Sequence, residues 1–109
     1  MARKLPPVDP DVSPLAGGVS ALGLIVRNAR AHGGFRIDDA AQLAGVSSDL
    51  VSRLENGKPV TTDKLFKLLD TMGLTMLVMP HAQASQALRV VQQETTANPT
   101  EARHGDDHG

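Results

Sequence analysis

The sequence predicts an all-α fold, a compact bundle of short helices, followed by a short C-terminal β-strand that pairs across a dimer. Apolar residues recur at helical spacing between Ser20 and Met72, and glycines or Asn-Gly follow the predicted helices. An almost wholly apolar run then lies between Gly73 and Pro80. A chain of 109 residues has room for one such domain.

Residues 1–19 are rich in proline and glycine, which disfavour helices and β-ladders, so we expect a flexible N-terminal arm. The first helix is expected to begin at Ser20 and to end at Gly33 and Gly34. Its buried stripe follows the spacing i, i+3, i+4 and i+7 and consists of Leu22, Ile25, Val26 and Ala29.

A second, shorter helix is expected from Ile37 or Asp38 to Ala44. The acidic residues Asp38 and Asp39 fall in its first turn, where the helix dipole favours negative charge. Small buried contacts are expected from Ala40, Ala41, Leu43 and Ala44.

A third helix is expected from Ser47 to Asn56, after a tight turn at Gly45. Ser47 suits the N-cap position because its hydroxyl can accept a free backbone N–H. Val51 and Leu54 give this helix its inner face.

A fourth helix is expected from Asp63 to Met72, capped by Thr61 or Thr62 and closed by Gly73. Its apolar face is the broadest in the chain and contains Leu65, Phe66, Leu68, Leu69 and Met72.

The apolar run that follows indicates a β-strand over residues 74–79. A single strand is not stable alone, and the rest of the chain is predicted to be helical, so the simplest partner is the same strand of a second copy. The dimer contacts would come from Leu74, Met76, Leu77, Val78 and Met79. We therefore expect a homodimer, with residues 20–80 as its folded domain.

Residues 81–109 are predicted to form a flexible C-terminal tail, with some helical character over 82–94. His104 and His108 have side chains that bind metals, but the adjacent glycines argue against the helix that would align them. No metal site is expected.

The composition excludes several classes of function. No cysteine is present, so the chain has neither a disulfide nor a thiol nucleophile. No membrane-spanning run and no signal-peptide pattern occurs, so we expect a cytoplasmic protein that does not bind membranes. Catalytic and phosphate-loop motifs are also missing, and we expect neither enzyme activity nor a cofactor.

The segment from residue 41 to residue 57 resembles the lambda-repressor-like family, the Xre/Cro type of helix-turn-helix proteins. The matching residues are Ala41, Gly45, Val46, Ser47, Val51, Ser52, Arg53, Leu54, Glu55, Asn56 and Gly57. The resemblance covers about residues 20–73. It implies a double-stranded DNA operator as partner and an ion pair between Arg30 and Glu55.

In this family the third helix enters the major groove, so the resemblance implies that its outward residues read bases. These are Ser48, Asp49, Ser52 and Arg53. Arg53 is the best candidate, because a guanidinium can donate two hydrogen bonds to guanine; the alternative is a phosphate contact or a surface ion pair. Ser48 suits a phosphate as well as a base, and Asp49 suits cytosine or an intrahelical role.

Other polar residues are candidates for phosphate contacts around this helix. They are Arg36, Ser47, Asn56, Lys58, Thr61 and Thr62. The family usually has glutamine at the start of the second helix, where it binds a phosphate. This chain has Ile37 there, so that contact is lost or is replaced by Arg36.

The order of helical bundle, apolar strand and tail resembles the HipB-like branch of the family. This resemblance implies an antitoxin that represses its own operon and neutralises a HipA-like kinase toxin. Two alternatives stay open. One is a phage-type repressor without a toxin, and the other is a protein-interaction module of the same fold with little DNA binding, which the formal net charge of −1 and Ile37 favour.

Overall fold

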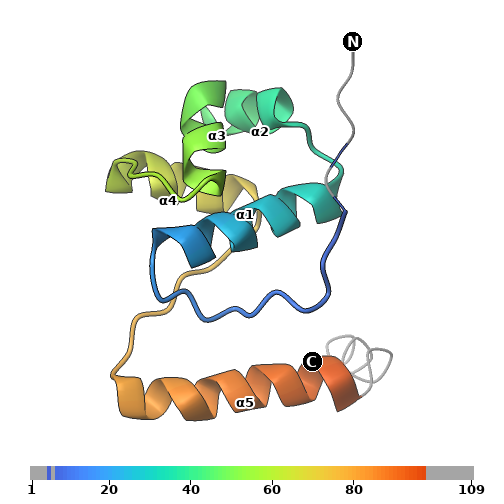
Figure 1. Cartoon of the computed structure of the whole chain (residues 1–109), viewed down its shortest axis with the longest axis vertical. Coiled ribbons are helices and arrows are strands. Elements are labelled where there is room, and N and C mark those ends of the chain that lie inside the picture. Colours follow the sequence, from blue (N-terminus) through green and yellow to red (C-terminus); the bar gives the residue numbers. More distant parts are fainter. Residues whose placement is uncertain (1–4, 6, 98–109) are drawn as a thin grey trace, which may run out of the picture. The chain divides into compact units, whose positions relative to one another are not determined.

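Five helices follow one another in the part of the chain that the computed structural model describes, residue 5 and residues 7–97 (Figure 1). They are α1 (Val19–Gly33), α2 (Ile37–Ala44), α3 (Ser48–Glu55), α4 (Thr62–Thr71) and α5 (His81–Ala97). The chain divides into two units, Met1–Met76 with α1 to α4 and Leu77–Gly109 with α5. His104 and His108 lie outside the described residues. No helix of the described part is long and apolar enough to cross a membrane.

The core of the first unit lies where α1, α2, α3 and α4 meet. α1 packs on α3, and α2 packs on both α3 and α4. The largest fully buried side chains there are those of Val26, Val51, Leu54 and Leu68. The inner face of α2 consists of alanines, which bring its backbone close to its neighbours. The core is completed by Ala40, Ala41, Ala44 and Leu69.

Two predicted core residues are exposed instead. Leu43 of α2 and Phe66 of α4 have exposed fractions of 61% and 51%. The prediction that they are buried was wrong because each lies roughly 100° around its helix from the centre of the buried stripe. Apolar character alone does not show which side of a short helix faces the core.

A close approach between α1 and α3 depends on Gly23. This glycine is buried, and a Cβ atom at its position would collide with the backbone carbonyl oxygen of Leu54. Only glycine lets α1 pass this near to the last turn of α3.

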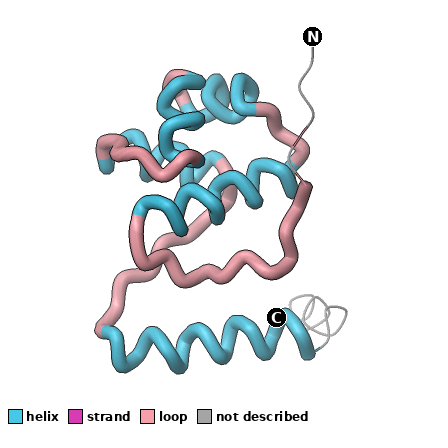
Figure 2. The backbone as a smooth tube through the Cα atoms, in the orientation of Figure 1, coloured by secondary structure: helices cyan, strands magenta, loops and turns pink. Residues whose placement is uncertain are grey.

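The segment from Leu74 to Met79 is an irregular connection (Figure 2), so the predicted strand is not formed in the single chain. A strand needs ladder hydrogen bonds to a second strand, and the described residues contain no strand that could supply them. Leu74 instead packs on the core, and its N–H donates to the carbonyl of Leu69 at 2.8 Å.

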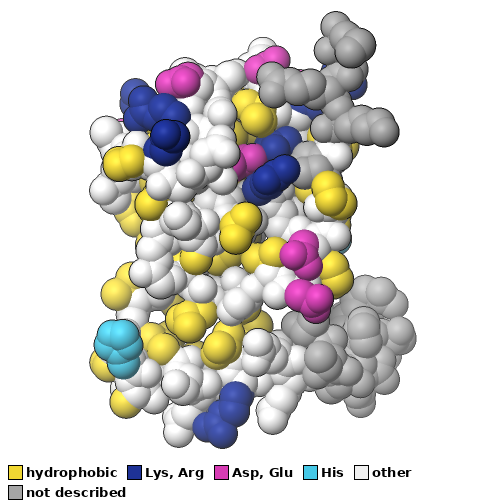
Figure 3. Space-filling model, viewed as in Figure 1, with side chains coloured by type: hydrophobic (Ala, Val, Ile, Leu, Met, Phe, Trp, Pro, Cys, Tyr) yellow, Lys and Arg dark blue, Asp and Glu magenta, His cyan; other side chains and the backbone are white. Residues whose placement is uncertain are grey.

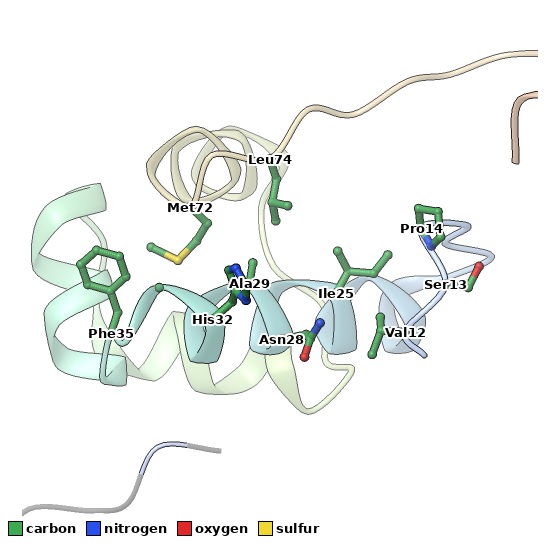
Figure 4. Close-up of a pocket in the computed structure, with 11 residues that line it drawn as sticks. Val12, Ser13, Pro14, Ile25, Asn28, Ala29, His32, Phe35, Met72 and Leu74 are labelled. Carbon is green, nitrogen blue, oxygen red and sulfur yellow. The ribbon is translucent and has the colours of Figure 1, made fainter. Parts of the chain in front are cut away.

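The N-terminal arm has no helix in its described part, but it is held against α1. The N–H of Asp9 donates to Asn28 Oδ1 at 2.6 Å, and Val12 is partly buried. The arm forms one wall of a groove of about 400 Å³ along α1 (Figure 4). The groove is lined by Val12, Ser13, Pro14, Ile25, Asn28, Ala29, His32, Gly33, Phe35, Met72 and Leu74.

α5 forms where the sequence predicted a flexible tail with some helical character. It begins directly after Pro80, whose carbonyl oxygen accepts hydrogen bonds from the N–H groups of Gln83 and Ala84 at 3.0 and 3.1 Å. Proline preceding a helix is favourable because its missing N–H would lack an intrahelical acceptor there in any case.

Candidate nucleic-acid interface

The turn between α2 and α3 is built on Gly45. Its φ of 73° is in the left-handed region, which glycine adopts without steric cost. The N–H of the next residue, Val46, donates to the carbonyl of Ala41 at 3.0 Å and so closes the end of α2. The connection between α2 and α3 is therefore only three residues long, Gly45 to Ser47.

α3 is fixed at its N-terminus by a capping residue. Ser47 Oγ accepts a hydrogen bond from the N–H of Leu50 at 3.1 Å. The hydroxyl of Ser47, a candidate for phosphate binding, is thus already engaged in capping, and its N-cap role was correctly predicted.

α3 is fixed at its other end by a buried ion pair. Arg30 Nε lies 2.7 Å from Glu55 Oε2, and Arg30 Nη2 lies 2.8 Å from Glu55 Oε1. A further bond joins Arg30 Nη1 to the carbonyl oxygen of Phe35 at 3.0 Å. The pair implied by the family resemblance is present, and it ties the last turn of α3 to α1 and to the α1–α2 connection.

The inner face of α3 is buried while its other side chains are left outside. Leu50, Val51, Leu54 and Glu55 are buried. Asp49 and Arg53 are exposed, and Ser48 and Ser52 are partly exposed. All four predicted base-reading residues therefore lie off the buried face of one short helix.

The side chains of Ser48, Asp49 and Arg53 have polar partners within the chain. Ser48 Oγ donates to Asp38 Oδ1 at 2.7 Å, which joins the first turns of α2 and α3. Arg53 contacts Asp49 through Nη1, 3.5 Å from Oδ2, and donates through Nη2 to the carbonyl oxygen of Pro59 at 3.0 Å.

The comparison with known families agrees with this geometry. The profile of the helix-turn-helix domain family matches residues 21–77, just over half of the chain. The chain belongs to this helix-turn-helix family. A comparison with curated proteins gave no match.

Apart from Ser47 at the N-cap of α3, the predicted phosphate-binding residues of this helix-turn-helix domain fall into two places. Asn56, Lys58, Thr61 and Thr62 follow the end of α3 and are all exposed. Asn56 also donates through Nδ2 to the carbonyl oxygen of Ser52 at 2.8 Å. Arg36 is exposed at the start of α2, at the N-cap position.

Charge is distributed unevenly over the helix-turn-helix domain. The first turns of α2 and α3 carry acidic residues, namely Asp38, Asp39 and Asp49. Basic side chains gather over α3, α4 and their connection (Figure 3). Exposed basic residues of these elements are Arg53, Lys58, Lys64 and Lys67. The same elements also expose the acidic residues Asp49, Asp63 and Asp70, so the excess of basic side chains on them is small.

Two residues that hydrogen-bond to the predicted base-reading side chains were not predicted as site residues by the sequence analysis. Asp38 accepts a hydrogen bond from Ser48, and the carbonyl oxygen of Pro59 accepts one from Arg53. Neither partner is signalled by a local pattern, because Asp38 belongs to another helix and the Pro59 contact uses a backbone oxygen. The described residues contain no group of three or more acidic or histidine side chains that could hold a metal ion.

Proposed function

We propose that this protein is a transcriptional repressor that binds a specific double-stranded DNA operator as a homodimer. The proposal rests chiefly on α3, an eight-residue helix that is fixed at both ends and keeps Ser48, Asp49, Ser52 and Arg53 off its buried face. A helix held in this way can enter a major groove without rearranging the domain. Binding, and not catalysis, is its proposed activity.

The first test is DNA binding across a salt series. The probe is a duplex that covers the DNA upstream of the gene for this protein, and gel-shift titrations give Kd at each salt concentration. If a dimer neutralises about five phosphates through groups such as Arg36 and Lys58, log Kd rises with log salt at a slope of about 4 to 5. The absence of a shifted band at every salt concentration would contradict the proposal.

The second test concerns base reading by Arg53. Arg53→Ala should lower the ratio of mismatched to matched Kd about 5- to 150-fold, the discrimination expected of a bidentate contact to guanine. Lys58→Ala is the control, since loss of a phosphate contact weakens binding to all sequences alike. Unaltered discrimination by Arg53→Ala, with the fold intact by circular dichroism, would remove Arg53 from the base-reading set.

We extend the proposal to an antitoxin that represses its own operon and neutralises a HipA-like kinase toxin. The support is the resemblance of the helical bundle and the apolar segment 74–79 to that branch of the family. Co-expression with the product of the neighbouring gene tests it, since an antitoxin should co-purify with that product and abolish its toxicity. A phage-type repressor would bind its operator equally well without such a partner.

A protein-interaction module is the second candidate, because the formal net charge is −1 and Ile37 replaces the usual phosphate-binding glutamine. Met76, Leu77 and Val78 offer it an apolar surface, with exposed fractions of 39%, 72% and 90%. This candidate predicts little DNA binding at any salt concentration, so the salt series separates the two functions.

A further inference from the structure

Asp49 and Arg53 face each other on the outward side of α3, one helical turn apart. Their side chains are 76% and 48% exposed, and Arg53 Nη1 lies 3.5 Å from Asp49 Oδ2. The other terminal nitrogen, Nη2, donates to the carbonyl oxygen of Pro59 at 3.0 Å. The guanidinium is therefore held from two sides, by a carboxylate of its own helix and by the backbone of the next connection.

We propose that Asp49 is a positioning residue, which orients the Arg53 guanidinium for reading a base and does not read a base itself. The inference rests on the proposed function, since it concerns the same DNA-reading surface.

The donors of Arg53 allow this arrangement. A guanidinium has five N–H donors, and the hydrogen bond to Pro59 uses one of them, while the 3.5 Å contact with Asp49 is an ion pair. The remaining donors are enough for the two hydrogen bonds that guanine accepts through O6 and N7. The contacts fix the plane of the guanidinium before DNA arrives, so less side-chain freedom is lost on binding.

The location of Asp49 also calls for an explanation. A carboxylate on the face that meets DNA is repelled by the phosphate chain and lowers affinity for every sequence. The helix dipole stabilises a negative charge in the first turn of α3, where Asp49 lies. That stabilisation does not depend on an arginine four residues later. A positioning role explains why the acid lies within reach of Arg53 and predicts a gain in specificity at the expense of affinity.

The probe is the duplex that the full-length protein selects from a pool of randomised duplexes, together with its single base-pair exchanges. The base pair read by Arg53 is the one whose exchange Arg53→Ala no longer distinguishes. Kd values for the matched and exchanged duplexes give the discrimination ratio at that pair. The variants are Asp49→Asn, Asp49→Glu, Arg53→Ala and the double variant Asp49→Asn/Arg53→Ala.

We expect Asp49→Asn to tighten binding to the exchanged duplex and to lower the discrimination ratio about two- to fivefold, the strength of an exposed ion pair. Asp39→Asn, which removes a charge from the first turn of α2, should tighten binding to both duplexes and leave the ratio unchanged. Asp49→Glu keeps an ion pair of the same spacing and should retain the ratio. In the Arg53→Ala background, Asp49→Asn should leave the discrimination ratios at all other base pairs unchanged.

Two results would overturn the inference while sparing the proposed function. An unchanged ratio in Asp49→Asn would show that Asp49 only repels DNA or stabilises the start of α3. A discrimination ratio that Asp49→Asn lowers at another base pair, equally with and without Arg53, would show that Asp49 reads a base directly. If no exchange loses discrimination in Arg53→Ala, the proposed role of Arg53 fails and the inference fails with it.

Discussion

Arg30 and Glu55 form the most constrained polar contact of the domain. Their side chains are 6% and 5% exposed, and two short hydrogen bonds join them in a bidentate arrangement. Burying two charges is costly unless they are paired and hydrogen-bonded, as they are here. The pair holds the last turn of α3 in position at the expense of desolvating both groups.

Arg30→Met should therefore destabilise the domain by about 3 to 5 kcal/mol, because it leaves the Glu55 carboxylate buried without its partner. Urea unfolding followed by circular dichroism measures the change. Arg27→Met, on the exposed side of the same helix, is the control and should alter stability by at most about 0.5 kcal/mol. Arg30→Met/Glu55→Leu should recover much of the loss, and equal instability of the single and double variants would argue against this explanation.

Gly23→Ala tests the close contact between α1 and α3. Alanine in place of glycine within a helix normally stabilises by about 0.5 to 1 kcal/mol. Here the added methyl group meets the carbonyl of Leu54, so we expect a destabilisation of about 1 to 3 kcal/mol or more. The sign of the change in thermal unfolding decides between the two effects.

Gly17→Ala is the matched control for that substitution. A Cβ atom at Gly17 meets nothing within 4 Å, and its φ is not in the left-handed region. Its melting temperature should stay at or slightly above that of the wild type. A Gly23→Ala variant as stable as this control would show that α1 and α3 can separate without cost.

At the scale of single elements, α3 depends on its cap because it has only eight residues. Ser47→Ala removes the acceptor for the Leu50 N–H and should lower the free energy of unfolding by about 1 kcal/mol. Ser47→Asp keeps an acceptor at the N-cap and should retain most of the stability. If both variants are equally stable, the cap does not contribute to holding α3.

The elements of the helix-turn-helix were predictable from the sequence because their signals are local. Gly45, Ser47 and the spacing of Val51 and Leu54 lie within one short segment, and α2 and α3 formed almost where these residues placed them. Leu43 was misplaced because its burial depends on how α2 is rotated against other helices. Periodicity over eight residues defines a helix but leaves its rotation loosely determined.

The contacts of the candidate site were less predictable, because they join residues whose partners carry no local signal. Arg30 with Glu55 came from the family resemblance and not from spacing. Ser48 with Asp38, and Arg53 with Pro59, depend on how α2 and the α3–α4 connection are placed beside α3. The sequence alone does not show that Ser48 and Arg53 donate hydrogen bonds within the chain, because those bonds depend on how the elements pack.

At the scale of the whole molecule, the exposure of the apolar segment after α4 has no explanation within a single chain. Leu77 and Val78 are 72% and 90% exposed, and they lie between Gly73 and Pro80 in an irregular connection. The sequence predicted a strand here by assuming a second copy. The described residues contain no second strand with which it could pair, so its absence leaves the dimer a prediction.

Leu77→Asp tests that prediction. A charge in an apolar dimer contact is costly to bury, so the variant should elute as a monomer in size-exclusion chromatography. It should also bind the operator more weakly, because two half-sites about one helical turn apart need two linked copies. Leu24→Asp, at an exposed leucine of α1, is the control and should elute as the wild type does. An unchanged elution volume for Leu77→Asp would contradict the dimer.

The shortness of α3 has a consequence for how the protein responds to heat. A helix of eight residues is not stable by itself in water, and this one is kept by Ser47 at its beginning and by Arg30 at its end. The surface proposed to recognise DNA therefore forms only when the whole domain is folded. Warming a marginally stable variant should release bound DNA at the temperature at which the core melts, so a core substitution that lowers the melting temperature should also lower the temperature at which the proposed DNA complex dissociates.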